Sequence, residues 1–297
     1  MRKPTLLSLI LKELEKERRI IAADWRIHVI YMRIAHSGGF ALPTGSKVKQ
    51  LIRKLAASGD IEELSTIAGI YVFTVPFASF VSSPDEALLQ EANPTAVLSH
   101  YTAAAYHNLT YELPMEYHLT YYPNSFIRLP LGTVPEDWVD VPKPRCRTPK
   151  TIRGKPILWH KSKKEWDFGH TLGFSQGYPI YVTDLERTLL DAIRFPERCG
   201  GITEVFRIWR RAVDSLRVDV LVNYVEQFSQ ALLRQRVGFI LEEIGITPPI
   251  LEEWANKSVR GSSAKLIANS DFAPTFSERW KLSINVPESI LSELKEE

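Results

Sequence analysis

The chain is poor in cysteine and has no long apolar run. Its 297 residues include only two cysteines, Cys146 and Cys199, which lie far apart in the sequence. So few thiols are typical of a reducing cytosol and argue against a disulfide scaffold. No segment is apolar for the roughly 20 residues that a membrane-spanning helix needs. An apolar run from Thr5 is interrupted by Lys12 and Glu13, too early for a signal peptide. We therefore expect a cytoplasmic protein without membrane contact.

Motifs of common catalytic, cofactor and metal sites are also missing. No glycine-rich loop could cradle a phosphate group, and no Gly-Ser turn is followed closely by paired aspartates. His100 and His107 lie seven residues apart, with no cysteine or acid in register to complete a metal site. We expect no catalytic residues, no cofactor and no bound metal.

The most informative segment present is a basic helix predicted over residues 46–59. Its apolar positions recur at helical spacing and predict a buried face: Val48, Leu51, Ile52, Leu55 and Ala56. The remaining positions hold four cations, one amide and no acid: Lys47, Lys49, Gln50, Arg53 and Lys54. Ser46 can cap the first turn, and Ser58-Gly59 can end the helix.

Two apolar runs, residues 61–67 and 70–75, follow this helix and are joined around Ala68-Gly69. A helix followed by a hairpin is the order of a recognition helix and its wing. Lysines would neutralise phosphates, and Gln50 and Arg53 have donors that could read base edges. The alternative is an ordinary helix with a solvated basic face. Residues 1–80 hold twelve Lys and Arg against seven Asp and Glu, which favours a nucleic-acid surface.

A second basic segment spans residues 141–164, with nine Lys or Arg and no acid. From it we take four further candidates for DNA contact: Arg145, Arg147, Lys150 and Arg153. The alternative, a solvated loop and a strand edge protected by lysines, stays open at this point.

The length favours two domains. We predict an α+β protein with a winged helix-turn-helix domain at residues 1–80 and a larger mixed α/β domain at 81–297. A polar linker at 79–84 would join them. In the larger domain we expect a helix at 85–92, another at 99–109, strands at 116–122, 156–159 and 178–182, and a closing strand at 280–286. Between these strands lie four predicted helices, at 184–194, 202–213, 217–226 and 229–244.

The start of the first of these four helices has a complete structural explanation. Thr183 and Glu186 form a predicted capping box, and Arg187 and Asp191 can pair four residues apart. A metal-dependent nuclease would need an acid followed by an acid-x-lysine strand, which is missing around Asp184.

Four segments together resemble the AbiEi-type antitoxin family. The most recognisable is 182–192, VTDLERTLLDA, followed by Pro196-Glu197 and Gly200-Gly201. Residues 99–110 are similar to the family's opening helix, 236–242 to its late helix, and 280–286 to its closing strand. Their order and spacing extend over nearly the whole chain.

The resemblance implies an antitoxin of a type IV toxin–antitoxin system, linked to phage defence by abortive infection. Such proteins pair a winged helix with a C-terminal antitoxin domain and repress transcription of their own operon at inverted repeats in its promoter. They counter a nucleotidyltransferase-type toxin without forming a stable complex. We also expect a monomer in solution that binds double-stranded DNA cooperatively. The alternative function is a metal-dependent nuclease targeted by the winged helix.

Overall fold

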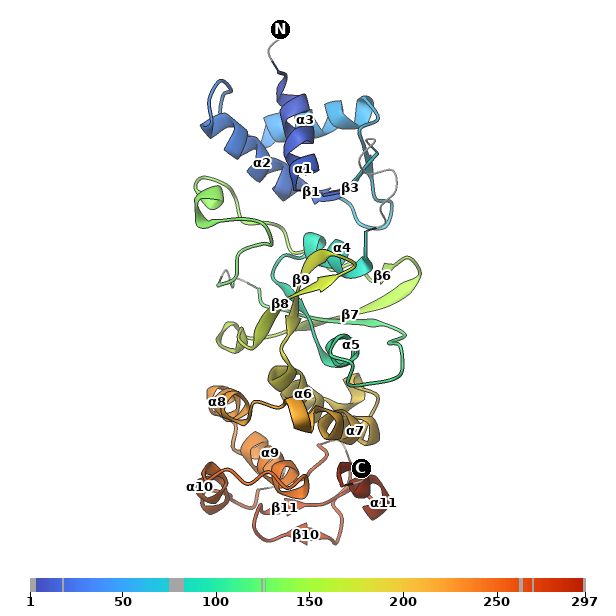
Figure 1. The fold of residues 1–297 in the computed structure, drawn as a ribbon, viewed down its shortest axis with the longest axis vertical. Coiled ribbons are helices and arrows are strands. Elements are labelled where there is room, and N and C mark those ends of the chain that lie inside the picture. Colours follow the sequence, from blue (N-terminus) through green and yellow to red (C-terminus); the bar gives the residue numbers. More distant parts are fainter. Residues whose placement is uncertain are drawn as a thin grey trace. The chain divides into compact units, whose positions relative to one another are not determined.

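A computed structural model describes residues 4–17, 19–74, 83–123, 125, 127–261, 264–268 and 270–295. The fold is of the predicted α+β class and divides into two compact units (Figure 1). Unit 1 consists of residues 1–97, 121–164 and 172–181; unit 2 consists of 98–120, 165–171 and 182–297. The predicted domains, 1–80 and 81–297, were defined as segments that could fold independently. The division into compact units does not test independent folding, so these domains stay a prediction. Residues 79–82 of the predicted linker lie outside the described residues.

The helices of the described part of the chain are α1 Leu6–Lys16, α2 Asp24–His36, α3 Gly45–Ala57, α4 Asp85–Ala92, α5 His100–Tyr106, α6 Leu185–Arg194, α7 Ile202–Ala212, α8 Val218–Phe228, α9 Ala231–Glu243, α10 Ile250–Asn256 and α11 Glu288–Leu291. Its strands are β1 Ile21–Ala23, β2 Ile61–Glu63, β3 Ile70–Phe73, β4 Ala96–Leu98, β5 Tyr117–Tyr121, β6 Thr151–Ile152, β7 Lys155–Lys161, β8 His170–Ser175, β9 Tyr178–Thr183, β10 Phe276–Ser277 and β11 Leu282–Ser283. The helix predicted at 85–92 is confirmed to the residue, and the four helices predicted after residue 184 are confirmed to within two residues at each end.

The first elements of unit 1 are three helices and a small antiparallel sheet of order β1-β3-β2. Ile21 pairs with Val72, and Ile61 pairs with Phe73. Helix α2 is buried over most of its length, including the side chains of Ile27 and Ile30. Helices α1 and α3 pack on α2 and help to bury it. The apolar spacing of α3 predicts the face that makes this contact.

A six-stranded mixed sheet has the order β6-β7-β5-β4-β9-β8. The β4–β9 pair is parallel, with Leu98 opposite Val182, and the β6–β7 pair is antiparallel. Strands β4 and β8 were not predicted from the sequence. Strand β4 is buried at all three of its positions and therefore has no alternating pattern to reveal it.

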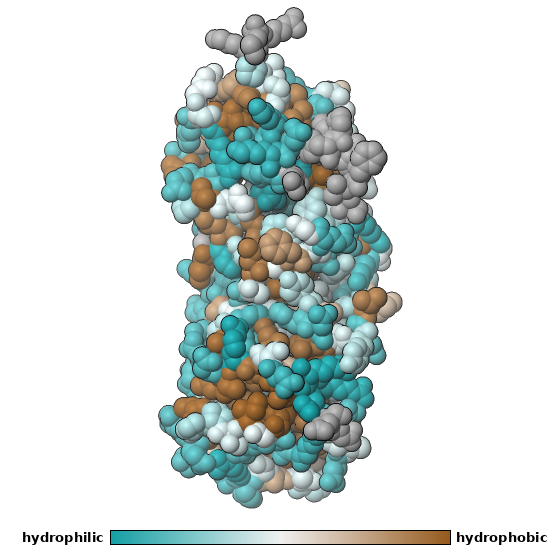
Figure 2. All heavy atoms as spheres, in the orientation of Figure 1, coloured by the Kyte–Doolittle hydropathy of each residue, from teal (hydrophilic) through white to brown (hydrophobic). Residues whose placement is uncertain are grey.

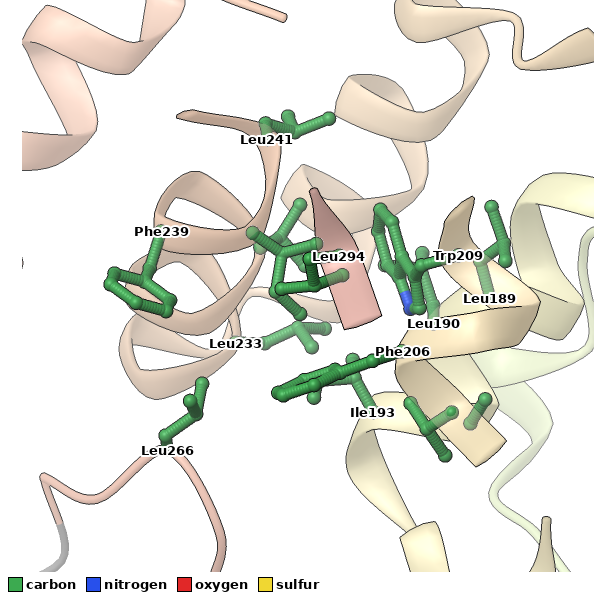
Figure 3. Close-up of a cluster of buried hydrophobic side chains, with 14 of the residues drawn as sticks. Leu189, Leu190, Ile193, Phe206, Trp209, Leu233, Phe239, Leu241, Leu266 and Leu294 are labelled. Atoms are coloured by element: carbon green, nitrogen blue, oxygen red, sulfur yellow. The ribbon is translucent and has the colours of Figure 1, made fainter. Parts of the chain in front are cut away.

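The core of unit 2 lies among helices α6 to α9, where Phe206 and Trp209 of α7 point toward Leu190 and Ile193 of α6 (Figure 3). The predicted closing strand is shorter than 280–286: only Leu282–Ser283 pairs as β11. Trp280 is instead buried against the backbone of Gly238 in α9, where a Cβ atom would overlap the indole ring. This close approach explains the glycine in the middle of a helix.

Two predicted helix caps are wrong. Thr44, not Ser46, precedes the first turn of α3, and its hydroxyl accepts a hydrogen bond from the Lys47 amide. Asp184, not Thr183, caps α6 by accepting from the Arg187 amide at 2.9 Å. The Glu186 side chain is fully buried and accepts from the backbone N–H and the guanidinium of Arg217, so it takes no part in a capping box.

A buried ion pair fixes the start of α2 within unit 1. The Glu91 carboxylate of α4 accepts from Arg26 Nε at 2.8 Å and from Arg26 Nη2 at 2.7 Å. It also accepts from the Ala23 amide, and the Glu91 carbonyl accepts from the Trp25 indole. Burial by itself would raise the pKa of Glu91, but Arg26 and the Ala23 amide outweigh it and hold the pKa below its ordinary 4.5.

Removing one member of this pair should destabilise unit 1 strongly. Glu91→Gln leaves the Arg26 guanidinium uncompensated in the interior, which costs about 3–5 kcal/mol. Arg26→Met with Glu91→Leu should recover most of that loss. Urea denaturation followed by circular dichroism measures both. Because the Glu91 pKa is lowered on folding, the pair's contribution should be present at neutral pH and disappear as the pH falls below 4.5.

The exposed pair Lys257–Glu253 is the control, since both of its side chains are more than half exposed. Lys257→Met should change the free energy of unfolding by no more than about 1 kcal/mol. A Glu91→Gln protein as stable as this control would contradict the assigned role of the buried pair.

The corrected cap of α6 gives a second prediction. Asp184→Ala should destabilise unit 2 by about 1 kcal/mol, the usual loss for a helix N-cap, with a further loss because Tyr224 donates to Asp184 at 2.7 Å. Asp184→Asn keeps a cap oxygen and should lose less. The urea midpoints of the two variants measure these losses of stability. If both variants lose the same stability, the effect comes from the charge of Asp184 and not from its capping hydrogen bond.

Candidate nucleic-acid interface

Helix α3 separates its apolar and polar residues cleanly. One face of the helix packs against the rest of unit 1. Its side chains are the buried Val48, Leu51 and Leu55 and the half-buried Ile52. The five polar candidates predicted from the sequence are all exposed: Lys47, Lys49, Gln50, Arg53 and Lys54. Ala56, which was expected on the buried face, is exposed as well. The small alanine side chain lies at the margin of the apolar stripe, where the core does not reach it.

The cations of α3 are not neutralised by neighbouring acids. Among the described residues, no carboxylate lies within ion-pairing distance of Lys49, Arg53 or Lys54. Lys47 donates to the Leu42 carbonyl at 3.3 Å. The first turn of α3 contains no acid, so the positive end of the helix dipole adds to the charge of these side chains. The face is therefore an exposed cationic surface on a rigid helix.

The hairpin that follows α3 has the opposite charge. Residues 61–74 contain Glu62 and Glu63 and no Lys or Arg, and both glutamates are exposed. Glu63 accepts a hydrogen bond from the amide of Gly69, whose φ of +77° makes the turn into β3. An acidic hairpin repels phosphates, so it cannot supply the contacts that a basic wing would make.

Some cations of the second basic segment, 141–164, are ion-paired within the protein, and others are exposed to solvent. Arg147 is half-buried, donates to Asp24 at 2.6 Å and packs directly on Gly69 of the hairpin turn. Arg153 is exposed but donates to Asp85 and to the Ser83 carbonyl. Arg145 and Lys150 are exposed, and within the described ranges neither has an acid partner. Arg147 and Arg153 thus have structural roles that the sequence did not reveal.

The acids at the start of α6 all have partners. Asp184 caps the helix and binds Tyr224, Glu186 binds Arg217, and Asp191 accepts from both Arg187 and Arg194. Burial of the Tyr224 ring, and next its hydrogen bond to the Asp184 carboxylate, raise the pKa of the tyrosine. Every one of these carboxylates holds an arginine, a tyrosine or a backbone amide in place.

A buried polar cluster in unit 2 was missed by the sequence analysis. Ser99 Oγ lies 2.8 Å from His100 Nδ1 and accepts from Thr120 at 2.9 Å, while the rings of His100 and His118 are 5.9 Å apart. Burial lowers the pKa of His118, although Glu116 opposes the shift. Eighteen residues separate the two histidines, so their spacing gave no signal.

Comparisons with known proteins leave the family open. No protein-family model matches the chain, and no curated protein does. The crystal structure of the RV2827C protein from Mycobacterium tuberculosis is similar over 95% of this chain and 92% of that one, with a TM-score of 0.48 and 14% identity. A likeness this distant indicates no shared function.

No helix in the described ranges is long and apolar enough to cross a bilayer.

If α3 contacts phosphates, its cations should set the salt dependence of DNA binding. Changing Lys49, Arg53 and Lys54 together to alanine leaves the buried stripe of α3 intact, so the fold should persist. The slope of log affinity against log salt should flatten by about 0.9 for each lost phosphate contact. Fluorescence anisotropy with duplex DNA at several salt concentrations measures this slope.

The matched control changes Lys257, Lys281 and Lys295 of unit 2 to alanine, which removes the same net charge. These lysines form exposed ion pairs far from α3 in the sequence. The control slope should equal that of the unaltered protein. If both triple variants flatten the slope equally, the binding follows overall charge and α3 is not the interface.

Proposed function

We propose that this protein is a DNA-binding repressor of its own promoter and an antitoxin that counters a nucleotidyltransferase-type toxin, without enzymatic activity. The DNA-binding half of the proposal rests on one observation. Helix α3 exposes Lys49, Arg53 and Lys54, which have no acid partner in the part of the chain that the structure describes, and it buries Val48, Leu51 and Leu55 on its other side. A helix built in this way can enter a major groove without loss of its packing.

The order of the first elements supports a winged-helix assignment. Helices α1, α2 and α3 are followed by the β2–β3 hairpin, and β1 completes a three-stranded antiparallel sheet. In this proposal α3 is the recognition helix, with Gln50 and Arg53 as the side chains able to read bases. The hairpin stays outside the groove, because Glu62 and Glu63 would be repelled by phosphates.

The antitoxin half rests on the resemblance of residues 182–192 to the AbiEi-type family. In this segment Glu186, Arg187, Thr188 and Asp191 are each at most 2% exposed. Buried residues of this kind determine how unit 2 folds and are not available to bind a toxin or its target. In this proposal neutralisation uses other residues, exposed on the surface of unit 2.

The acids of residues 184–191 give no support to the alternative, a metal-dependent nuclease. The acids that such an enzyme would use, Asp184, Glu186 and Asp191, are each engaged by a cation, a tyrosine or a backbone amide. We therefore propose a role in binding for this protein and not one in cleavage.

Two readouts in one strain test the proposal. A reporter fused to the region upstream of the gene measures repression, and growth after induction of the neighbouring toxin gene measures protection. The full-length protein should give both. The triple alanine variant of Lys49, Arg53 and Lys54 should lose repression and keep protection, because unit 2 is unchanged.

The lysine control variant of unit 2 should retain repression. Loss of protection together with repression in the α3 variant would mean that neutralisation operates through DNA binding. Failure of the unaltered protein to protect cells would remove the antitoxin half of the proposal.

A further inference from the structure

We infer that α3 reads an A·T base pair and the neighbouring G·C pair in the major groove of duplex DNA. Gln50 contacts the adenine and Arg53 contacts the guanine. Lys47 and Lys54 contact the phosphates on one side of the groove, and Lys49 contacts those on the other side. This inference rests on the proposed DNA binding and deepens it, because it assigns a base or a phosphate to each long polar side chain of the helix.

The buried side chains of α3 determine which residues lie at the centre of its outer face. Two residues further along an α-helix, the side chain has turned by about 200° and points to nearly the opposite side. Arg53 is two residues from both Leu51 and Leu55, which are 6% and 0% exposed. Gln50 is two residues from Val48, which is 5% exposed. Gln50 and Arg53 therefore project away from the core of unit 1.

Small residues lie at both ends of this central line. Ser46 and Arg53 are seven residues apart, about two turns, so they lie on the same line of the helix surface. Ala57 follows Arg53 by four residues, and both Ser46 and Ala57 are exposed. Because these two side chains are small, α3 can approach a surface closely while Gln50 and Arg53 extend toward it.

The three lysines lie along the two margins of the outer face. Side chains three or four residues apart are neighbours on a helix surface. Lys47 and Lys54 are therefore neighbours of Leu51, at one edge of the apolar stripe. Lys49 is a neighbour of the half-buried Ile52, at the other edge. Going around α3, the order is apolar stripe, lysines, the line of Gln50 and Arg53, lysine, and apolar stripe again.

This order matches the cross-section of a major groove. A helix in the groove has base edges in front of it and a phosphate backbone on each side. Lysine is a compact charge that suits phosphates, whereas a Gln amide or an Arg guanidinium forms paired hydrogen bonds with a base edge. The central line therefore faces bases, and the two margins face phosphates.

The spacing of Gln50 and Arg53 places their contacts on neighbouring base pairs. The two residues are three positions apart, which is about 4.5 Å along the helix axis. Successive bases of one strand are about 3.4 Å apart. Gln pairs with adenine through N6 and N7, and Arg pairs with guanine through O6 and N7. The DNA that fits α3 therefore has an A·T pair beside a G·C pair.

Duplex DNA fits this face better than duplex RNA or a protein. The major groove of A-form RNA is too deep and narrow for side chains to read. Within Gly45–Ala57 no large apolar side chain is exposed, as a protein partner would require. Figure 2 shows hydrophobic residues gathered instead over the region where Figure 1 draws α6 to α9.

Selection of bound sequences from a library of random DNA duplexes tests the assignment with the full-length protein. The unaltered protein should enrich a motif that contains an A·T pair beside a G·C pair. Gln50→Ala should lose the preference for the A·T pair alone, and Arg53→Ala the preference for the G·C pair alone. Both side chains are exposed, so both variants should fold, which urea denaturation checks.

Lys54→Ala is the matched control, because it removes the same charge from the same helix as Arg53→Ala. Lys54→Ala should lower the affinity for the selected duplex and for a scrambled duplex by the same factor. Arg53→Ala should lower the affinity for the selected duplex by at least about five-fold, and for the scrambled duplex by less. Replacing the guanine by 7-deazaguanine, which lacks the N7 acceptor, should weaken binding of the unaltered protein and leave that of Arg53→Ala unchanged.

Two kinds of failure are distinguishable. The assignment is overturned if Arg53→Ala weakens both duplexes by the same factor, if 7-deazaguanine weakens binding of both proteins equally, or if the library is bound without enrichment. In each of these cases DNA binding itself stands. Absence of any binding to the library would contradict the proposed function as well.

Discussion

The ion pair between Arg26 and Glu91 is the constraint on which the arrangement of unit 1 depends. Glu91 holds the start of α2 through the Arg26 guanidinium and the Ala23 amide, and α3 packs on α2. The position of the cationic face of α3 therefore follows from a carboxylate on α4, outside the predicted winged helix. A buried ion pair adds little net stability compared with a well-packed apolar pair. It does favour one arrangement of the two helices, because any arrangement that separates the charges leaves them buried and unpaired.

The sequence predicted elements whose signal is local. Helix 85–92 and the four helices after residue 184 have apolar stripes, and all of them except 217–226 have a Pro or Gly close to one end; both signals can be read without knowledge of the partner. The polar face of α3 was also predictable, because the same stripe that buries Leu51 and Leu55 exposes the cations. Caps were less predictable. Thr44 and Ser46 both have a side-chain oxygen that could cap a helix, as do Thr183 and Asp184, and the choice between them depends on where the backbone becomes helical.

The sequence could not predict which cations of the basic segment 141–164 form ion pairs within the protein. Arg147 and Asp24 are 123 residues apart, and no periodicity connects them. Once Arg147 is paired and packed on Gly69, its charge is largely satisfied within unit 1. Arg145 and Lys150 have no such partner among the described residues, although the sequence presents all of them as one cationic run. Charge in a sequence therefore overestimates the charge available to a ligand, and the excess is set by tertiary contacts.

The same distinction between paired and available charge applies to the segment 182–192 of unit 2. The motif at 182–192 stands out in the sequence because Glu186, Arg187 and Asp191 are charged, yet all three are buried and joined to other charges. A buried charge tolerates few substitutes, because removing its partner leaves it unpaired in the interior. Such residues are held in the interior by their partners and are covered from solvent. Exposed groups such as Lys49 on α3 contribute nothing to the buried core, so it is at such positions, and not at the buried charges of 182–192, that function can be tested separately from stability.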